Sequence, residues 1–414
     1  MKVLVIGSGI VGLSTAYALA REGHDVSVVD GAAAPGSATS FANGAQLSYN
    51  FVAPLADPEV LGKLPQWLTS ADSPLRLMLT LDPALVRWSL HFLQACRRSV
   101  ALQTTQELLL LGLHSRLLMH EMQEREAFDF DFESKGKLLV YQNEQALAGA
   151  RAQMGKQAGL GCEQRELSAA QCLTLEPALE DISARVVGGV FTPSEDSGDC
   201  HALCMELHRA LSTRYGVGFH FNTAVEGFRT EAGRIAAALT SEGDLQADAY
   251  VVANGTGAQK LLSDLGMNPL IYPLKGYSLT YTLTPQSRAP QLSVSDVHNK
   301  VVYARLGNRL RVAGMVDIGD RSTILVPQRL SLLKSQVQDY LPRLNAAEPP
   351  LEWAGLRPAR PDSKPLIGKT RLRNLWINGG HGALGFTLAA ASAAVLVDRI
   401  AGRQSAVPPA MFQL

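Results

Sequence analysis

Three glycines near the start of the chain have the spacing of a nucleotide-binding turn. Gly7, Gly9 and Gly12 fit the pattern G-x-G-x-x-G. In that pattern the first glycine permits a tight turn, the second lets the backbone approach a pyrophosphate, and the third lets a helix pack closely on a strand. Asp30 stands eighteen residues after Gly12, close to the spacing of a carboxylate that binds a ribose hydroxyl. An acid here, rather than an arginine, disfavours a 2′-phosphate and therefore NADP.

A second group of residues suits the binding of a carboxylate. Arg357 lies between Gly355 and Pro358, which stiffen the backbone that aims it, and its planar guanidinium can make two parallel hydrogen bonds. The alternative is a surface arginine at the end of a strand. Arg305 is a second candidate, although the alternation around it also suits an arginine that faces solvent. Tyr277 could donate its hydroxyl to the same carboxylate, or it could be a core tyrosine with a satisfied hydroxyl.

The elements around the glycines are those that a dinucleotide site requires. Residues 3–6 form a short apolar run, a helical pattern follows and ends near Gly23, and a second apolar strand closes at Asp30. The helix N-terminus favours the negative charge of a pyrophosphate. The uncharged stretch from Val3 to Ala20 is therefore interpreted as this unit and not as a signal peptide or membrane span. The fingerprint alone does not separate FAD from NAD, but the polar stretch and long helical patterns that follow Pro35 differ from a second mononucleotide half.

Composition sets the broad class. With 414 residues the chain favours two closely associated domains, and Lys+Arg and Asp+Glu are equal at 38 each, which gives no reason to expect nucleic acid as a partner. The five cysteines form no CxxC pair and are odd in number, which suits a reducing compartment such as the cytoplasm. Cys200, Cys204 and His208 share one helical face but are expected to be core residues, so no metal site is predicted.

Five stretches resemble the D-amino-acid dehydrogenase family, within the wider D-amino-acid oxidase and glycine oxidase superfamily. They are residues 39–48 (TSFANGAQLS), 197–200 (SGDC), 272–280 (YPLKGYSLT), 311–315 (RVAGM), and 353–361 with 378–387 (WAGLRPARP and NGGHGALGFT). The chain departs from the family at Gly44-Ala45, where Ala-Gly is usual. It departs again at Tyr49-Asn50-Phe51, where a Pro-Gly-Tyr-type sequence is usual, in a loop that lies near substrate in the family.

The resemblance implies noncovalent FAD, oxidation of a D-amino acid to a 2-oxo acid and ammonia, and electron transfer to a respiratory acceptor such as quinone. It also implies that Arg357 binds the substrate carboxylate. His381 lies in a glycine-rich turn that leads into a helix, which would place N–H groups near the flavin; the alternative is a histidine merely tolerated in a loop. The residues expected to contact the cofactor are Gly7, Gly9, Ile10, Val11, Gly12, Asp30, Ser40, Asn43, Gly44, Gln46, Leu47, Val225, Asn254, Gly255, Gly355, Gly380, Gly382, Leu384, Gly385, Phe386 and Thr387.

We therefore expect an α/β fold, with a Rossmann-type FAD-binding domain and a discontinuous α+β substrate domain built on an antiparallel sheet. The expected division is 1–46, 145–265 and 350–414 for the FAD domain, and 47–144 and 266–349 for the substrate domain. An amine, glycine or sarcosine-type oxidase that uses oxygen, and a flavin subunit of a larger complex, remain alternatives. Apolar residues such as Trp67, Leu68, Leu75, Leu77, Met78, Leu79 and Leu81, near Lys63 and Arg76, raise the further hypothesis of a peripheral contact with the inner face of the cytoplasmic membrane.

Overall fold

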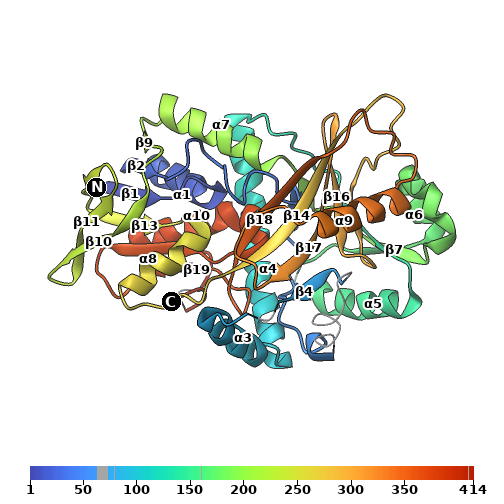
Figure 1. Ribbon diagram of the computed structural model, residues 1–414, viewed down its shortest axis with the longest axis horizontal. Helices are drawn as coiled ribbons and strands as arrows, with labels where there is room; N and C mark the ends of the chain where they lie inside the picture. Colours follow the sequence, from blue (N-terminus) through green and yellow to red (C-terminus); the bar gives the residue numbers. More distant parts are fainter. Residues whose placement is uncertain (63–72, 79, 160, 409) are drawn as a thin grey trace.

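A computed structural model describes residues 1–62, 73–78, 80–159, 161–408 and 410–414. Figure 1 shows two sheets side by side, with the long strands β14 (Tyr272–Thr282) and β18 (Leu351–Ala359) near the centre of the molecule. The expected mixture of a Rossmann-type unit and a second, largely antiparallel sheet is confirmed.

The first sheet contains the N-terminal strand and is mostly parallel. Its strand order is β19-β20-β13-β1-β2-β9, and only the β19–β20 pair is antiparallel. Val3 and Val5 pack into a core with α1, α7 and α10 on one face, while Leu4 and Ile6 face a second core on the other. The elements are β1 (Lys2–Ile6), α1 (Ile10–Arg21), β2 (Asp25–Val29), α7 (Cys200–Thr213), β9 (Gly218–His220), β13 (Ala249–Val252), β19 (Leu366–Lys369), β20 (Leu375–Gly379) and α10 (Gly385–Ile400).

A small antiparallel sheet and a short helix cover the Leu4 face of the first sheet. They are β10 (Val225–Glu231), β11 (Arg234–Thr240), β12 (Gly243–Leu245) and α8 (Ala258–Asp264), the last preceded by the turn η2 (Gly255–Gly257). Strand β13 is fully buried within the first sheet, whereas β10 belongs to this outer layer.

The second sheet has the order β18-β14-β17-β16-β15-β5-β7-β6, and β4 pairs with β17. Its pairs are antiparallel except β15–β5 and β17–β4. The segments KLLVY, YSLTYTL and RLRVAGM all form strands of this sheet. The strands not yet named are β4 (Leu75–Leu77), β5 (Lys137–Tyr141), β6 (Arg165–Ser168), β7 (Gly188–Thr192), β15 (Ser293–Asp296), β16 (Val301–Leu306) and β17 (Arg309–Ile318). A two-stranded pair, β3 (Gln46–Leu47) with β8 (Asp196–Ser197), lies outside both sheets.

The remaining helices show how the chain divides between the two sheets. Apolar residues of α4 belong to the same core as α1 and α10, and α9 packs on the core beneath β14 and β17. The helices are α3 (Pro83–Ala95), α4 (Arg98–Glu126), α5 (Glu144–Ala158), α6 (Ala169–Leu175), η1 (Pro177–Arg185), α9 (Pro327–Tyr340) and η3 (Gly382–Leu384).

This division differs from the expected one in three places. Strand β18, which was assigned to the FAD domain, pairs with β14 of the second sheet. Strands β6 and β7, assigned to the same domain, also belong to the second sheet, because β7 pairs with β5 and β6 pairs with β7. Helix α4, assigned to the substrate domain, packs on α10 instead. The reason is that each element packs on segments far away in the sequence: β18 pairs with β14, and α4, which lies between β4 and β5 in the sequence, packs on α10.

The apolar stretch Gly382–Ile400 is long enough to cross a membrane by length and composition. In the fold it is the turn η3 and helix α10, which pack against α1 and α4. Leu388, Ala389, Val395 and Leu396 have no exposed surface. The stretch is therefore a core helix of this fold.

Candidate functional site

The loops that follow four parallel strands meet at one edge of the first sheet. Strand β1 is followed by Gly7, β2 by Asp30, β13 by Asn254 and β20 by His381. Because β1, β2, β13 and β20 run in the same direction, their carboxyl ends share that edge, where ligands of open α/β sheets bind.

The glycine turn is closed by packing in a way that only glycine permits. Gly7 has φ +110°, and a Cβ there would lie 2.7 Å from the Ala253 carbonyl oxygen. A Cβ on Gly12 would lie 1.9 Å from the carbonyl oxygen of Gly7. At Gly9 the nearest atom would be the Ser40 Oγ, at 3.5 Å, so a Cβ there would make only an ordinary contact with the protein. The turn therefore has the form that a pyrophosphate at the N-terminus of α1 requires.

Asp30 is held in a fixed orientation at the end of β2. Its Oδ2 accepts hydrogen bonds from the Ser8 N–H at 2.6 Å and the Ser8 hydroxyl at 2.8 Å, and its Oδ1 accepts from the Ala32 N–H at 2.9 Å. Each carboxylate oxygen has a further acceptor site, so the group can still bind a ribose. Ser8 was not predicted from the sequence. Val225 lies nearby, since Thr223 donates its N–H to the Asp30 carbonyl.

Residues 39–48, which we call the strap, cross one face of the second sheet. Six contacts occur in the order of the strands. Thr39 donates to the Leu356 carbonyl of β18, Ala42 accepts from Ser278 of β14, Asn43 accepts from Arg311 of β17, Gly44 approaches Val302 of β16, Gln46 donates to Ser293 of β15, and Ser48 accepts from Lys137 of β5.

The strap also links the two helix N-termini of the first sheet. Near its start, the Ser40 hydroxyl accepts from the N–H of Ile10 in α1 at 3.1 Å. At its end, the Ser48 N–H donates to the Thr387 hydroxyl in α10 at 3.0 Å. Ile10, Ser40 and Thr387 were all expected to contact the cofactor, and the structure brings them together along one segment between the two sheets.

At Gly44-Ala45, where the chain departs from the family, the backbone adopts an unusual conformation. Ala45 has φ +57°, in the left-handed region that favours glycine. Its methyl group packs with Ala304 and Leu306 in a small buried cluster, and its N–H donates to the Asn43 side chain at 3.0 Å. These contacts hold a conformation that the usual Ala-Gly order would adopt without strain.

Arg357 faces the strap. It pairs with Leu274 of β14, and its guanidinium lies so close over Gly276 that a Cβ there would be 2.3 Å from it. Its Nη1 donates to the Met315 carbonyl at 3.2 Å. Part of its surface remains accessible, yet protein surrounds it densely enough that burial lowers its pKa to about 10. Both observations fit a guanidinium that faces an interior ligand position.

Tyr277 is not at this position, which corrects the prediction. It follows Gly276 along β14, so its side chain points to the opposite face of the sheet. There its hydroxyl donates to Asp317 at 2.8 Å, and that carboxylate also forms ion pairs with Arg76 and Arg329. Tyr277 is therefore a buried structural residue, as the alternative interpretation held.

Arg305 is also away from the strap. Its Nε donates to the Gly307 carbonyl at the β16–β17 hairpin, in an exposed setting. The strand arginine that does reach the strap is Arg311, which was not predicted as a site residue. It is only 4% exposed and donates to the Asn43 carbonyl and the Thr280 hydroxyl.

His381 lies in the glycine-rich turn, 2% exposed, and pairs through its backbone with Ala359 at the end of β18. Burial lowers its pKa to about 3, so the ring is neutral at ordinary pH, and its buried Nε2 has no hydrogen-bond partner in the described chain. Gly380 and Gly382 have φ of +79° and +57°. The turn thus leaves a polar side-chain atom and the N-terminus of α10 for a ligand.

Three cations on the strap face, two of them buried and Arg357 half-buried, lack a carboxylate partner. Among the described residues, no Asp or Glu oxygen lies within 4 Å of the charged groups of Lys137, Arg311 or Arg357. Burial lowers the pKa of each group. Because isolated buried charge is costly, this face is suited to anionic ligands. The cradle at Gly7 and Gly12 and these cations together fit a dinucleotide with an anionic substrate beside it.

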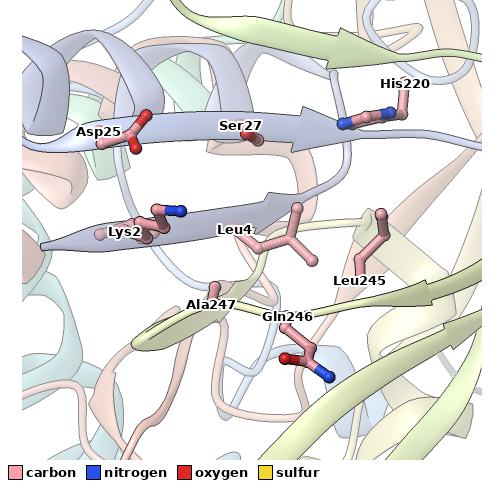
Figure 2. Close-up of a pocket in the computed structure, with 9 residues that line it drawn as sticks. Lys2, Leu4, Asp25, Ser27, His220, Leu245, Gln246 and Ala247 are labelled. Atoms are coloured by element: carbon pink, nitrogen blue, oxygen red, sulfur yellow. The ribbon is translucent and has the colours of Figure 1, made fainter.

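A separate hollow lies away from this edge of the first sheet. It has a volume of about 190 Å³ and is on the Leu4 face of the first sheet, between β1, β2 and the end of β12 (Figure 2). Lys2, Asp25 and His220 line it. It is smaller than a typical ligand site of about 300 to 1,000 Å³ and lies away from the glycine turn, on the opposite face of β1 from α1.

Comparisons with known proteins agree with this geometry. A family model described as FAD dependent oxidoreductase (DAO) matches residues 2–399. The chain is 45% identical to a protein named D-amino acid dehydrogenase 2 from Ralstonia nicotianae, covering 100% of both chains, and 43% identical to one of the same name from Pseudomonas aeruginosa, covering 98% of this chain and 96% of the other. Glycine oxidase from Geobacillus kaustophilus has the same fold, with a TM-score of 0.79 at 21% identity over 100% of this chain and 97% of the other.

Proposed function

Because the chain belongs to the DAO family of FAD-dependent oxidoreductases, we propose that it catalyses the oxidative deamination of D-amino acids. The observation that carries the proposal is the half-buried Arg357, which has no carboxylate partner within 4 Å among the described residues, in a chain whose relatives over nearly full length are named D-amino acid dehydrogenases. Sequence resemblance and site chemistry thus support the same substrate class.

In the proposed reaction the substrate loses a hydride from Cα and a proton from its amino group, and water hydrolyses the resulting imine to a 2-oxo acid and ammonia. FAD, when bound, supplies the ring that takes up the hydride. The residues that would hold it are those of the Gly7–Gly12 turn, Asp30, the strap and the turn at 380–387.

The protein groups position the substrate. Arg357 would bind the α-carboxylate through two parallel hydrogen bonds. Its guanidinium lies directly over Gly276 of β14, which leaves room for it because glycine has no Cβ. His381, with a pKa of about 3, is too weak a base to take the amine proton at neutral pH. We therefore assign it a hydrogen-bonding role toward the ligands, and a substrate with a neutral amine needs no protein base.

The test is anaerobic bleaching of the flavin absorbance with matched D- and L-amino acids, including both enantiomers of alanine and proline. Bleaching by the D-forms alone is the expected result. Bleaching by glycine or sarcosine together with rapid oxygen uptake would support an oxidase instead. No bleaching by any of these, with FAD bound, would contradict the proposal and favour a subunit role.

We further propose that electrons pass to a quinone at the inner face of the cytoplasmic membrane. Helix α3 presents Val86, Leu90 and Leu93 on one exposed stripe, with exposed fractions of 55%, 57% and 43%, beside the exposed Arg87 and Arg97. An apolar stripe flanked by arginines suits the surface of an anionic bilayer.

The residues first suggested for this contact are only partly consistent with it. Met78 and Leu81 are exposed, Leu77 is half-buried and Leu75 is buried. Arg76 is held by Asp317. Lys63, Trp67, Leu68 and Leu79 lie outside the described residues.

Co-sedimentation with vesicles that contain anionic lipid tests the membrane contact. The double change Val86→Glu and Leu90→Glu should abolish sedimentation without changing the rate with an artificial acceptor. Leu351→Glu, at an exposed leucine of β18, is the matched control. Equal sedimentation of all three proteins would contradict the assignment of α3.

A further inference from the structure

Lys137 is a buried cation at the end of the strap that the proposed reaction does not use. It is 3% exposed, and its Nζ donates to the Ser48 hydroxyl at 2.9 Å. The same atom lies 4.8 Å from the centre of the Phe51 ring, within the range of a cation–π contact. A lysine side chain is rarely buried so completely without an ion-pair partner.

The position of Lys137 connects it to residues expected to hold FAD. In the parallel pair of β5 with β15, Lys137 lies opposite Ser293, whose hydroxyl accepts from Gln46. Ser48, which accepts from Lys137, donates its N–H to Thr387 of α10. The ammonium group is therefore hydrogen-bonded directly to the strap at Ser48, and Ser48 links it to Thr387 at the N-terminus of α10.

We propose that Lys137 is a positioning residue for the flavin. It fixes the end of the strap through Ser48, and its positive charge raises the reduction potential of the bound flavin. The inference rests on the family's FAD and on the strap proposed to contact it, but not on the identity of the amino-acid substrate. Flavin gains negative charge when it is reduced, and a fixed cation in a water-poor site stabilises that charge.

The other groups around Lys137 do not form a direct ion pair with it. Glu195 attracts Lys137 electrostatically, but its Oε1 accepts from both the N–H and the side-chain amide of Asn50, at 2.7 and 3.0 Å. No ion pair of 4 Å or less joins Glu195 to Lys137 within the described chain. Burial raises the pKa of Glu195, and the positive charge of Lys137 opposes that rise. Thr192, opposite Lys137 on β7, carries no charge.

The experiment measures the affinity of the FAD-loaded enzyme for sulfite, which forms an anionic adduct with oxidised flavin, and the reduction potential of the flavin. Lys137→Gln keeps a donor for Ser48 and removes the charge, whereas Lys137→Arg keeps the charge. Lys137→Met is a second neutral variant in case Lys137→Gln does not bind FAD. Lys135→Met is the matched control, because Lys135 is 47% exposed and pairs with Glu133 at the surface.

We expect both neutral variants to bind sulfite about tenfold more weakly, with a fall in the reduction potential of about 30 mV for a two-electron couple. Lys137→Arg should restore both values, and Lys135→Met should change neither. Unchanged sulfite affinity in either neutral variant, or a loss that arginine does not restore, would overturn the proposal. These readouts need no amino acid, so the inference can succeed or fail separately from the proposed substrate.

Discussion

Replacing Arg357 by methionine should weaken carboxylate binding and stabilise the protein without ligands. The guanidinium has no acidic partner within 4 Å among the described residues, and burial lowers its pKa to about 10 from an ordinary value of 12.5. At about 1.4 kcal/mol per pKa unit, the folded protein disfavours this charge by at most about 3 kcal/mol. Methionine is unbranched, reaches about as far as the Nε of arginine and carries no charge, so it removes this penalty.

The expected losses follow from the same group. Truncating one partner of a buried, hydrogen-bonded charge pair costs about 2 to 5 kcal/mol, and about 1.4 kcal/mol is a factor of ten. We therefore expect kcat/KM with D-alanine to fall about 30- to 3,000-fold. The free energy of unfolding of the FAD-free protein should rise by about 1 kcal/mol or more, after the loss of the hydrogen bond to Met315 is offset.

Steady-state kinetics with an artificial acceptor and urea unfolding of the FAD-free protein measure the two effects. Arg305→Met is the matched control, since Arg305 lies at an exposed hairpin, and it should change neither quantity. If Arg357→Met keeps kcat/KM within threefold of the unmodified enzyme, Arg357 does not bind the carboxylate. If the FAD-free variant is less stable, the guanidinium is not an uncompensated charge.

Three further outcomes are expected. Gly276→Ala should lower kcat/KM about 100-fold, because its Cβ would displace the Arg357 guanidinium that lies 2.3 Å away; an unchanged value would show that the guanidinium can move without cost. Tyr277→Phe should leave KM unchanged but destabilise the protein by about 1 to 2 kcal/mol in urea unfolding, because it removes a buried hydrogen bond to Asp317. Burial lowers the pKa of Lys137 to about 8, below its unfolded value of about 10.4, so the unfolded chain holds more protons between these pH values. The free energy of unfolding should therefore rise with pH over this window more steeply in the unmodified protein than in Lys137→Met, and parallel profiles would contradict this.

The sequence was sufficient for the N-terminal unit because its signals are local. Gly7 and Gly12 are within one turn of each other, and Asp30 follows in the next strand. The helix end near Gly23 was also located correctly, since Gly23 has φ +79°. Each of these features depends on neighbours within about thirty residues, so the pattern alone fixes them.

The face of each strand could not be read in the same way. Alternation along β14 shows that Gly276 and Tyr277 point to opposite faces, but not which face meets the strap. That depends on residues more than two hundred positions away, such as Ala42, which accepts from Ser278. The same kind of distant contact distinguishes Arg311, which donates to Asn43 of the strap, from Arg305, which donates to the Gly307 carbonyl. One signal was present but unused: glycine within a long strand often marks a close approach by another group, and Gly276 is such a residue.

The domain division failed for a related reason. The strap contacts strands β18 to β5 in order, so the residues that join the two sheets come from both ends and the middle of the chain. Sequence boundaries assume that each segment serves one core. Here β18 pairs with the second sheet, while its last residue, Ala359, meets His381 of the first.

The placement of charge explains why a neutral chain can hold two anionic ligands. Positive and negative residues are equal in number, so the net charge contains no information on the site. Lys137 and Arg311 are buried, and Arg357 is half-buried, on one face of one sheet. None has an acidic partner within 4 Å in the described chain, and burial opposes the charge of each. A pyrophosphate, a reduced flavin and a carboxylate would supply the negative charge that these cations lack as a partner. FAD and substrate should therefore stabilise the fold by more than their contact area implies, because binding also relieves charge that the empty fold must bear.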